Sequence, residues 1–301
     1  MSVHAPPTVL TFSLSDPTGA GGVLADALTC ASMGCHAAAV ITAVAVQDSR
    51  QTEDHLLLDE EWVDDQARAV LQDMPVAAIK VGAVGSSDNA QAIAEILSDY
   101  PDLPVVFDPF PAAAGSENEP DAELMAALRE LVLPQASVLT LSLAQARSWL
   151  VLAAGDEAPA GFSAAECARH LRNWGAEWVL ITGTDQLGEH VVNTLYGPEG
   201  HVQNESIERQ ALRFRGAGDT LSAAVAALLA QGIQVGDAVR EANDYLAQTL
   251  AGGFRLGMGD ALPDRLFWAG EDGEDGDEDG EGGTDDEDDG AGAVGARRAR
   301  H

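Results

Sequence analysis

The chain has 301 residues, 46% of them hydrophobic, and its 49 acidic and 16 basic side chains give a formal charge of −33. This balance argues against nucleic-acid binding, because proteins bind nucleic acids by neutralising phosphates with lysine and arginine. No apolar run is long enough to span a membrane and the first residues lack a signal-peptide pattern, which predicts a cytoplasmic protein without a membrane partner. The three cysteines are too few and too irregularly spaced for a disulfide framework or a zinc site.

Short apolar runs alternate with longer helical patterns over residues 1–270. Strands are predicted at 8–13, 37–44, 76–82, 104–108, 137–141 and 178–182, with helices at 22–33, 60–72, 88–98, 121–131, 143–151 and 163–174. An antiparallel pair turning at Gly197–Gly200 follows, and then helices at 218–231 and 235–250. This alternation predicts one α/β domain, residues 1–270, in which helices cover both faces of a mostly parallel sheet.

The remaining residues, 271–301, form an acidic tail. Its first part, residues 271–289, contains 13 acidic side chains and no basic or aromatic one, and its end carries Arg297, Arg298 and Arg300. Such a segment cannot bury enough apolar surface to offset the entropy of ordering it. We therefore expect residues 271–301 to be disordered, with solubility or docking to a basic partner as their role.

Polar or glycine-rich residues follow the first predicted strand, the fourth predicted strand and the antiparallel pair. In a mostly parallel sheet the ligand site lies at the carboxyl ends of the strands. Residues 15–22 read SDPTGAGG after the first strand, Asp108 ends the fourth, and residues 215–220 read RGAGDT before an apolar helix. The glycines of that last segment permit close backbone approach, and the N-terminus of the helix can bind an anion. Asp219 could take a proton from an attacking alcohol there, or it could merely cap its helix.

Several segments, taken together and in this order, resemble the hydroxymethylpyrimidine and phosphomethylpyrimidine kinases of the ribokinase superfamily. The resemblance runs from about residue 8 to 268. It is strongest at 15–26, SDPTGAGGVLAD, and continues at 46–49, VQDS, at 79–82, IKVG, and at 108–109, DP. The closing segment, LGMG at 256–259 followed by Pro263 and Phe267, is also similar to the end of these kinases.

The resemblance implies a ribokinase-like three-layer fold and a small-molecule kinase that uses ATP and Mg²⁺. The substrate would be 4-amino-5-hydroxymethyl-2-methylpyrimidine of thiamine biosynthesis, with phosphorylation of its monophosphate left open, and the enzyme would be a homodimer. The resemblance assigns substrate binding to Asp26 and Gln47, an anion hole to Gly216, Ala217 and Gly218, and the catalytic base to Asp219. It places Asp108 near phosphate and metal and Thr182 and Gly183 near the nucleotide, and it assigns no protein side chain as a direct metal ligand.

Departures from the family pattern keep two alternatives open. The pyrimidine kinases carry cysteine at the position of Asp219. Many pyridoxal kinases carry aspartate there, as this chain does, so pyridoxal is an alternative substrate. Gln145 replaces a glutamate that favours hydrated Mg²⁺, and Thr182 replaces a lysine near the nucleotide. These losses also fit a catalytically weakened paralogue that acts by binding. Lys80, the single lysine, could reach phosphate or lie at a surface edge.

Overall fold

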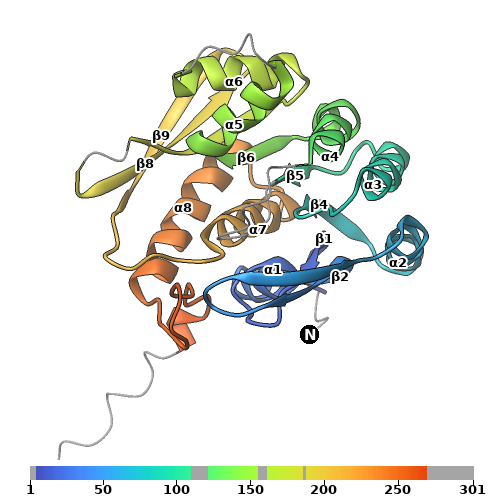
Figure 1. The fold of residues 1–301 in the computed structure, drawn as a ribbon, viewed down its shortest axis with the longest axis horizontal. Coiled ribbons are helices and arrows are strands. Elements are labelled where there is room, and N and C mark those ends of the chain that lie inside the picture. Colours follow the sequence, from blue (N-terminus) through green and yellow to red (C-terminus); the bar gives the residue numbers. More distant parts are fainter. Residues whose placement is uncertain (1–4, 110–120, 155–160, 186–187, 270–301) are drawn as a thin grey trace, which may run out of the picture. The chain divides into compact units, whose positions relative to one another are not determined.

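The computed structural model of the chain describes residues 5–109, 121–154, 161–185 and 188–269. Its centre is a nine-stranded sheet with the order β3-β2-β1-β4-β5-β6-β7-β8-β9 (Figure 1). The five pairings from β2 to β7 are parallel, whereas β3 pairs with β2, and β8 with β7 and β9, in antiparallel fashion. The mostly parallel sheet predicted from the sequence is therefore confirmed.

The strands follow the predicted apolar runs closely. They are β1 (Thr8–Ser15), β2 (His36–Gln47), β3 (Thr52–Leu57), β4 (Val76–Val81), β5 (Val105–Phe107), β6 (Val138–Ser142), β7 (Trp178–Asp185), β8 (His190–Gly197) and β9 (Gly200–Glu208). The predicted turn at Gly197–Gly200 is confirmed, because these two residues pair at the end of the β8–β9 ladder. β3 was not predicted, and it extends the sheet beyond β2 as an edge strand.

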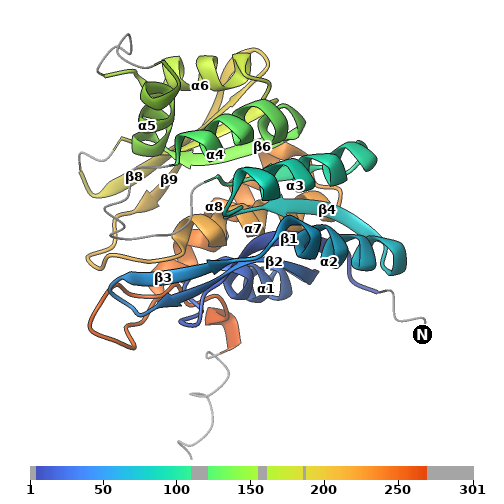
Figure 2. The same ribbon diagram turned by 45° about the vertical axis from the view of Figure 1, so that its right-hand side comes forward.

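Helices cover both faces of the sheet and make two separate cores (Figure 2). On one face pack α1 (Gly22–Ser32), α7 (Ala217–Ala230) and α8 (Val235–Ala251). On the other pack α2 (Glu60–Asp73), α3 (Ser87–Asp99), α4 (Ala122–Ala127), α5 (Leu143–Ala154) and α6 (Ala164–Asn173). These layers confirm the ribokinase-like α/β architecture expected from the resemblance.

The buried position of helix α7 explains why its sequence is apolar on nearly every side. Every residue from Asp219 to Leu229 is buried, because α1 and α8 flank α7 while its remaining face packs on the sheet. A helix with no solvent face must be apolar all round. Its N-terminal turn is therefore held firmly at the centre of the molecule, where the carboxyl ends of β1 and β4 lie nearby.

Three further results concern the predicted elements. The predicted helix 121–131 is α4 followed by a π-helical turn at Leu128–Val132 and a 3₁₀ turn at Leu133–Gln135. The acidic tail, 271–301, lies outside the described residues, so its predicted disorder stays a prediction. Within the part of the chain that the structure describes, no helix combines the length and apolar character needed to cross a membrane.

Candidate active site

The loop after β1 is organised by a buried aspartate. Asp16 has no solvent exposure, and its Oδ1 accepts hydrogen bonds from the Thr18 backbone N–H at 2.8 Å and the Thr18 hydroxyl at 2.7 Å. Its Oδ2 accepts from the Gly21 N–H at 2.9 Å. Asp16 thus folds the glycine-rich loop back on itself and fixes the start of α1.

A second loop meets this one at the N-terminus of α7. Gly216 caps the helix with a φ of +83°, a left-handed conformation that favours glycine. A Cβ atom there would collide with the carbonyl of Ala20, so the two loops touch only because residue 216 lacks a side chain. The first N–H groups of α7 have no partner within the helix, which leaves donors for an anion at the predicted anion hole.

Arg265 ties the two loops together. Its guanidinium is buried and donates to the carbonyls of Gly19 at 3.0 Å and Ala20 at 2.5 Å, while Nε donates to the Thr220 hydroxyl at 3.0 Å. A weaker contact to the Gly216 carbonyl spans 3.4 Å. The sequence does not predict this role, because nothing local marks Arg265 as a partner of loops at residues 19 and 216.

A buried lysine joins two of the predicted site residues. Lys80 on β4 has no solvent exposure, and its Nζ donates to Asp26 Oδ1 at 2.8 Å and to Asp219 Oδ1 at 3.2 Å. The expectation of a surface-edge lysine is therefore wrong. Burial alone would lower the pKa of Lys80, but the charges of Asp26, Asp219 and Asp108 outweigh it and raise this pKa, so Lys80 is an ammonium.

Two carboxyl groups near Lys80, those of Asp26 and Asp108, have raised pKa values. Burial raises the pKa of Asp26 to about 6 despite the opposing charge of Lys80. Burial and the nearby charge of Asp219 raise the pKa of Asp108 to about 7, although Ser222 donates a hydrogen bond to its Oδ2 at 3.2 Å. Three carboxyl groups share one ammonium here. Perturbed, buried titratable groups at the carboxyl ends of strands are typical of active sites.

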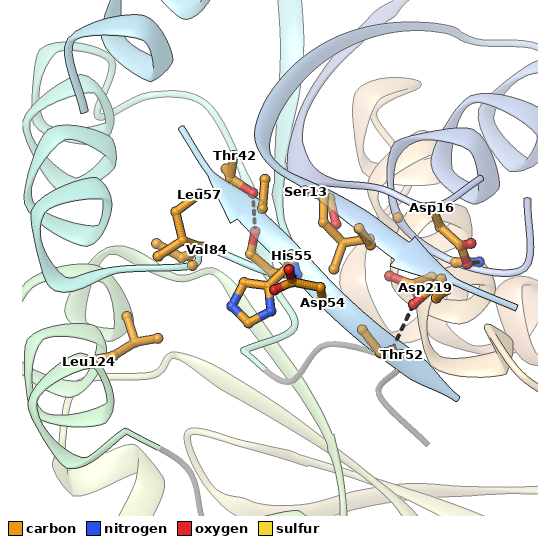
Figure 3. A pocket seen from close by; sticks show the side chains of 18 of the residues that line it. Ser13, Asp16, Thr42, Thr52, Asp54, His55, Leu57, Val84, Leu124 and Asp219 are labelled. Carbon is orange, nitrogen blue, oxygen red and sulfur yellow. Dashed lines mark hydrogen bonds between the residues drawn. The ribbon is translucent and has the colours of Figure 1, made fainter. Parts of the chain in front are cut away.

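A cavity of about 320 Å³ opens beside Asp219. Its wall comes from the end of β1, the β2–β3 hairpin and the loop after β4. In Figure 3, Leu57, Val84 and Leu124 gather at one end and Asp16 and Asp219 lie toward the other, with Asp54 and His55 between them. The volume suits a small molecule, and the two ends suit a ligand that is apolar on one side and polar on the other.

Gln47 lines this cavity, whereas Asp26 does not. The Oε1 of Gln47 accepts from the Thr52 hydroxyl at 2.8 Å and from Arg215 Nη2 at 3.1 Å. These bonds hold the amide in place and leave its N–H groups without a partner among the described residues. Asp26 lies behind the wall, and its Oδ2 is a buried oxygen with no partner in that part of the chain. A direct contact between Asp26 and a ligand therefore stays a prediction.

The predicted nucleotide residues lie in the second half of β7, where its pairing with β6 ends. Thr182 pairs with Ser142, and Gly183 adopts a φ of +66°. The Gly183 N–H donates to Asn193 Oδ1 at 3.0 Å, and Asn193 in turn donates to Asn243 Oδ1 at 2.6 Å. Two buried asparagines thus shape this strand end, and a nucleotide contact there stays a prediction.

Gln145, which replaces the glutamate of the family pattern, has a structural role. Its Oε1 accepts from the Ser142 N–H at 2.7 Å, while the Gln145 N–H donates to the Ser142 hydroxyl at 3.2 Å. This reciprocal pair is a capping box at the start of α5. The side-chain oxygen is therefore already engaged by the backbone.

The structure brings Asp26, Asp108 and Asp219 together around Lys80 and places Gly216, Ala217 and Gly218 in the turn that carries Asp219. Among the described residues, no group of three or more His, Cys, Asp or Glu side chains is placed to hold a metal ion. The arrangement can bind an anion at the end of α7 and accept a proton beside it.

Comparison with known proteins identifies the family. The sequence model of phosphomethylpyrimidine kinase matches residues 16–264. The chain belongs to this family. The resemblance stated from the sequence is thus confirmed, and the chain is a phosphomethylpyrimidine kinase family member over almost its entire described length.

Relatives in this family match nearly end to end. A hydroxymethylpyrimidine/phosphomethylpyrimidine kinase of Streptomyces coelicolor is 32% identical over 267 residues, 88% of this chain and 97% of that protein. One of Rhizobium meliloti is 33% identical over 251 residues, 83% of this chain and 92% of that protein.

Among solved structures, an ADP complex of Bacillus subtilis pyridoxal kinase has a TM-score of 0.75 at 25% identity, and the match covers 88% of this chain and 99% of that one.

Proposed function

We propose that this family member transfers the γ-phosphoryl group of ATP to the hydroxymethyl oxygen of 4-amino-5-hydroxymethyl-2-methylpyrimidine in thiamine biosynthesis. The observation that carries the proposal is the position of Asp219, which lines a substrate-sized cavity from the first turn of α7. The names of the Streptomyces and Rhizobium relatives support the pyrimidine as substrate. A cytoplasmic location and a homodimer are carried over from the family as part of the same proposal.

Asp219 acts as the general base in this mechanism. An alcohol must lose its proton as it attacks phosphorus, and a carboxylate within hydrogen-bond reach can accept that proton. The hydrogen bond from Lys80 Nζ at 3.2 Å fixes the orientation of the Asp219 carboxylate. The carboxylate is 7% exposed, so it faces the cavity while remaining largely dry.

Charge on the transferred group is stabilised by backbone amides, and the metal that accompanies ATP would add to this when bound. The N–H groups of the 216–218 turn hold the phosphoryl oxygens, assisted by the positive end of the α7 dipole. Mg²⁺ commonly binds one or two carboxylates together with substrate phosphates. Asp108, whose Oδ2 would lie 3.5 Å from a Cβ at residue 218, offers a hard oxygen donor beside this turn. When bound, Mg²⁺ would neutralise phosphate charge.

The substrate ring lies between the polar and apolar ends of the cavity. The free N–H groups of Gln47 can donate to a ring nitrogen, while an aminopyrimidine also offers donors of its own. Leu57, Val84 and Leu124 would contact the apolar edge of the ring (Figure 3). Asp26 is also proposed to bind the ring, and its Oδ1 accepts a hydrogen bond from Lys80.

The test is ADP release by the purified protein with Mg²⁺ and ATP, with the hydroxymethylpyrimidine and pyridoxal offered in parallel. We expect turnover on the pyrimidine, and we expect Asp219→Ala to reduce kcat by at least about 100-fold, because the base is lost. Circular dichroism and a thermal unfolding midpoint must show that the variant folds. Near-normal turnover by this variant would refute the role of Asp219.

One alternative substrate has its own support. The similarity to a pyridoxal kinase structure and the aspartate at position 219 favour pyridoxal, also a heteroaromatic compound with a hydroxymethyl group. Turnover on pyridoxal alone would keep the mechanism and change the substrate. No turnover on either compound, with the protein folded and stabilised by one of them, would favour the weakened paralogue that acts by binding.

A further inference from the structure

The guanidinium of Arg265 is a buried cation whose hydrogen bonds all go to uncharged oxygens. The acceptors are three carbonyls and one hydroxyl, those of Gly19, Ala20, Gly216 and Thr220. Among the described residues Arg265 forms no ion pair, whereas Lys80 contacts two carboxylates. Burial lowers the pKa of Arg265, although the charge of Asp219 opposes the shift. Arginine nevertheless stays protonated in proteins, so it keeps a positive charge that no direct contact cancels.

Arg265 also fixes the direction of the peptide units that it contacts. A peptide unit is planar, and its carbonyl and N–H point in opposite directions. The Ala20 carbonyl accepts from Arg265 Nη2 at 2.5 Å. On the other side of the same unit, the Gly21 N–H donates to Asp16 Oδ2 at 2.9 Å. This unit of the glycine-rich loop is therefore held from both sides.

The peptide unit between Gly216 and Ala217 is held on its carbonyl side. The Gly216 carbonyl accepts from the Thr220 N–H at 2.9 Å, from the Thr220 hydroxyl at 2.8 Å and from Arg265 Nη2 at 3.4 Å. The Ala217 N–H is at the first position of α7 and has no partner within the helix. Because the carbonyl is fixed toward Arg265, this N–H is fixed in the opposite direction, as a donor of the predicted anion hole.

The positive charge lies directly behind this donor. A Cβ atom at residue 216 would lie 2.8 Å from Arg265 Nη2, so the guanidinium is packed against the Gly216 backbone. A single peptide unit therefore separates the charge from an anion that accepts from the Ala217 N–H. In such a buried position, water screens the attraction between the guanidinium and the anion only weakly.

We propose that Arg265 is a positioning residue for phosphoryl transfer. It fixes the Ala217 N–H toward the transferred group and adds a positive charge behind that N–H. Both effects stabilise negative charge on the transferred group, and neither requires Arg265 to touch the substrate. The inference rests on the proposed function in taking the start of α7 as the anion hole, and it holds for the pyrimidine and for pyridoxal alike.

The test compares Arg265→Met and Arg265→Lys with the wild-type protein, using ADP release with Mg²⁺, ATP and the alcohol that the wild-type protein accepts. Methionine loses the charge and all donors. Lysine keeps the charge, but its single Nζ cannot hold the carbonyls of both loops. We expect kcat to fall by about 100-fold or more in Arg265→Met and by about 10-fold in Arg265→Lys, with KM for the alcohol within about threefold of the wild-type value.

Arg215→Met is the matched control, because Arg215 is also a buried arginine that holds a loop. It donates to the Asp48 carbonyl at 2.9 Å and to Gln47 Oε1 at 3.1 Å, and thus positions a predicted substrate ligand. Arg215→Met should raise KM for the alcohol more than it lowers kcat. The same kinetic pattern in the Arg215 and Arg265 variants, or an unchanged kcat in Arg265→Met, would overturn the inference and leave the proposed function standing.

Circular dichroism and thermal unfolding establish that each variant folds. If the Arg265 variants do not, Thr220→Val takes their place. It removes the hydroxyl that joins Arg265 Nε to the Gly216 carbonyl, while it keeps the shape of the side chain and the charge of Arg265. We then expect kcat to fall by about 10-fold without a change in KM for the alcohol. An unchanged kcat would overturn the inference.

Absence of ADP formation with either alcohol would contradict the proposed function instead. Calorimetric titration then decides the inference separately, with Mg²⁺ and either ADP or a non-hydrolysable ATP analogue. A loss of affinity for the analogue of at least about 10-fold in Arg265→Met, with unchanged affinity for ADP, supports the inference. Equal effects on the two nucleotides, or none, overturn it. Thr220→Val is titrated in the same way if Arg265→Met does not fold.

Discussion

At the scale of single residues, Lys80 lies within the sheet and contacts two carboxylates from different helices. Asp26 comes from α1 and Asp219 from α7, so the ammonium connects two helices that pack on the same face of the sheet. Removing one partner of a buried ion pair is costly, because the remaining charge is neither hydrated nor paired. Lys80 is therefore a positioning residue with a large effect on stability.

The variant Lys80→Met tests this role, because methionine keeps much of the length and loses the charge. We expect the free energy of unfolding to fall by about 3 kcal/mol, and kcat to fall because Asp219 is no longer held. Urea denaturation and the ADP assay measure the two effects.

A matched control removes an exposed cation instead. Arg240 pairs with Asp237 at 2.7 Å on the surface of α8, where both side chains are more than half exposed. Arg240→Met should cost less than about 1 kcal/mol, since exposed ion pairs contribute little. Equal losses in the two variants would contradict the role given to Lys80.

The sequence marks individual candidate residues more clearly than it marks the contacts between them. Asp219 and the glycines before it carry a local signal, since a glycine turn that opens an apolar helix predicts an anion site. Lys80 carries no such signal. Its partners lie 54 and 139 positions away along the chain, and an isolated lysine in an apolar strand fits several environments. Arg265 is likewise separated from Gly19 by 246 positions.

At the scale of elements, the junction of β6 and α5 shows how a departure from the family pattern is absorbed. Gln145 and Ser142 satisfy each other's backbone N–H groups through a capping box. The residues Ser-x-x-Gln already carry the signature of that motif. The helix predicted at 143–151 accordingly begins directly after Ser142, as this signature requires.

Gln145→Ala should therefore act on stability. We expect the free energy of unfolding to fall by about 0.5–2 kcal/mol, the usual effect of losing a helix cap, without change in the Mg²⁺ concentration needed for half-maximal activity. Gln145→Glu keeps an acceptor for the Ser142 N–H and should retain most of that stability. A raised Mg²⁺ requirement in Gln145→Ala, with unchanged urea denaturation, would show instead that this side chain serves the metal.

The strand β3 shows the opposite limit of prediction. Its sequence, TEDHLL, contains acidic residues that are uncommon in strands and lacks regular alternation. It forms because β2 offers an open edge, with which it pairs in antiparallel fashion after a short turn. Such pairing depends on tertiary context. The missed strand matters, because Thr52, Asp54 and His55 line the cavity from it (Figure 3).

At the scale of the whole molecule, the formal charge of −33 is a property that no single site explains. Residues 271–289 carry 13 acidic side chains, and residues 1–270 alone still carry a formal charge of −23. Like charges at this density repel one another in the folded state more than in the expanded unfolded chain. Salt weakens the repulsion, since the screening length falls from about 30 Å at 0.01 M to about 3 Å at 1 M.

We therefore expect the midpoint of thermal unfolding to rise between about 0.05 and 1 M NaCl, by about 2–4 °C for each kcal/mol of repulsion removed. Calorimetry on the full-length protein measures it. A chain that ends at residue 270 separates the two sources of charge. A similar rise of the midpoint in both proteins places the repulsion among residues 1–270. A rise of the midpoint only in the full chain places it in the tail. A midpoint that falls with salt would mean that attractive pairs such as Arg68 with Asp64 and Asp99 outweigh the repulsion.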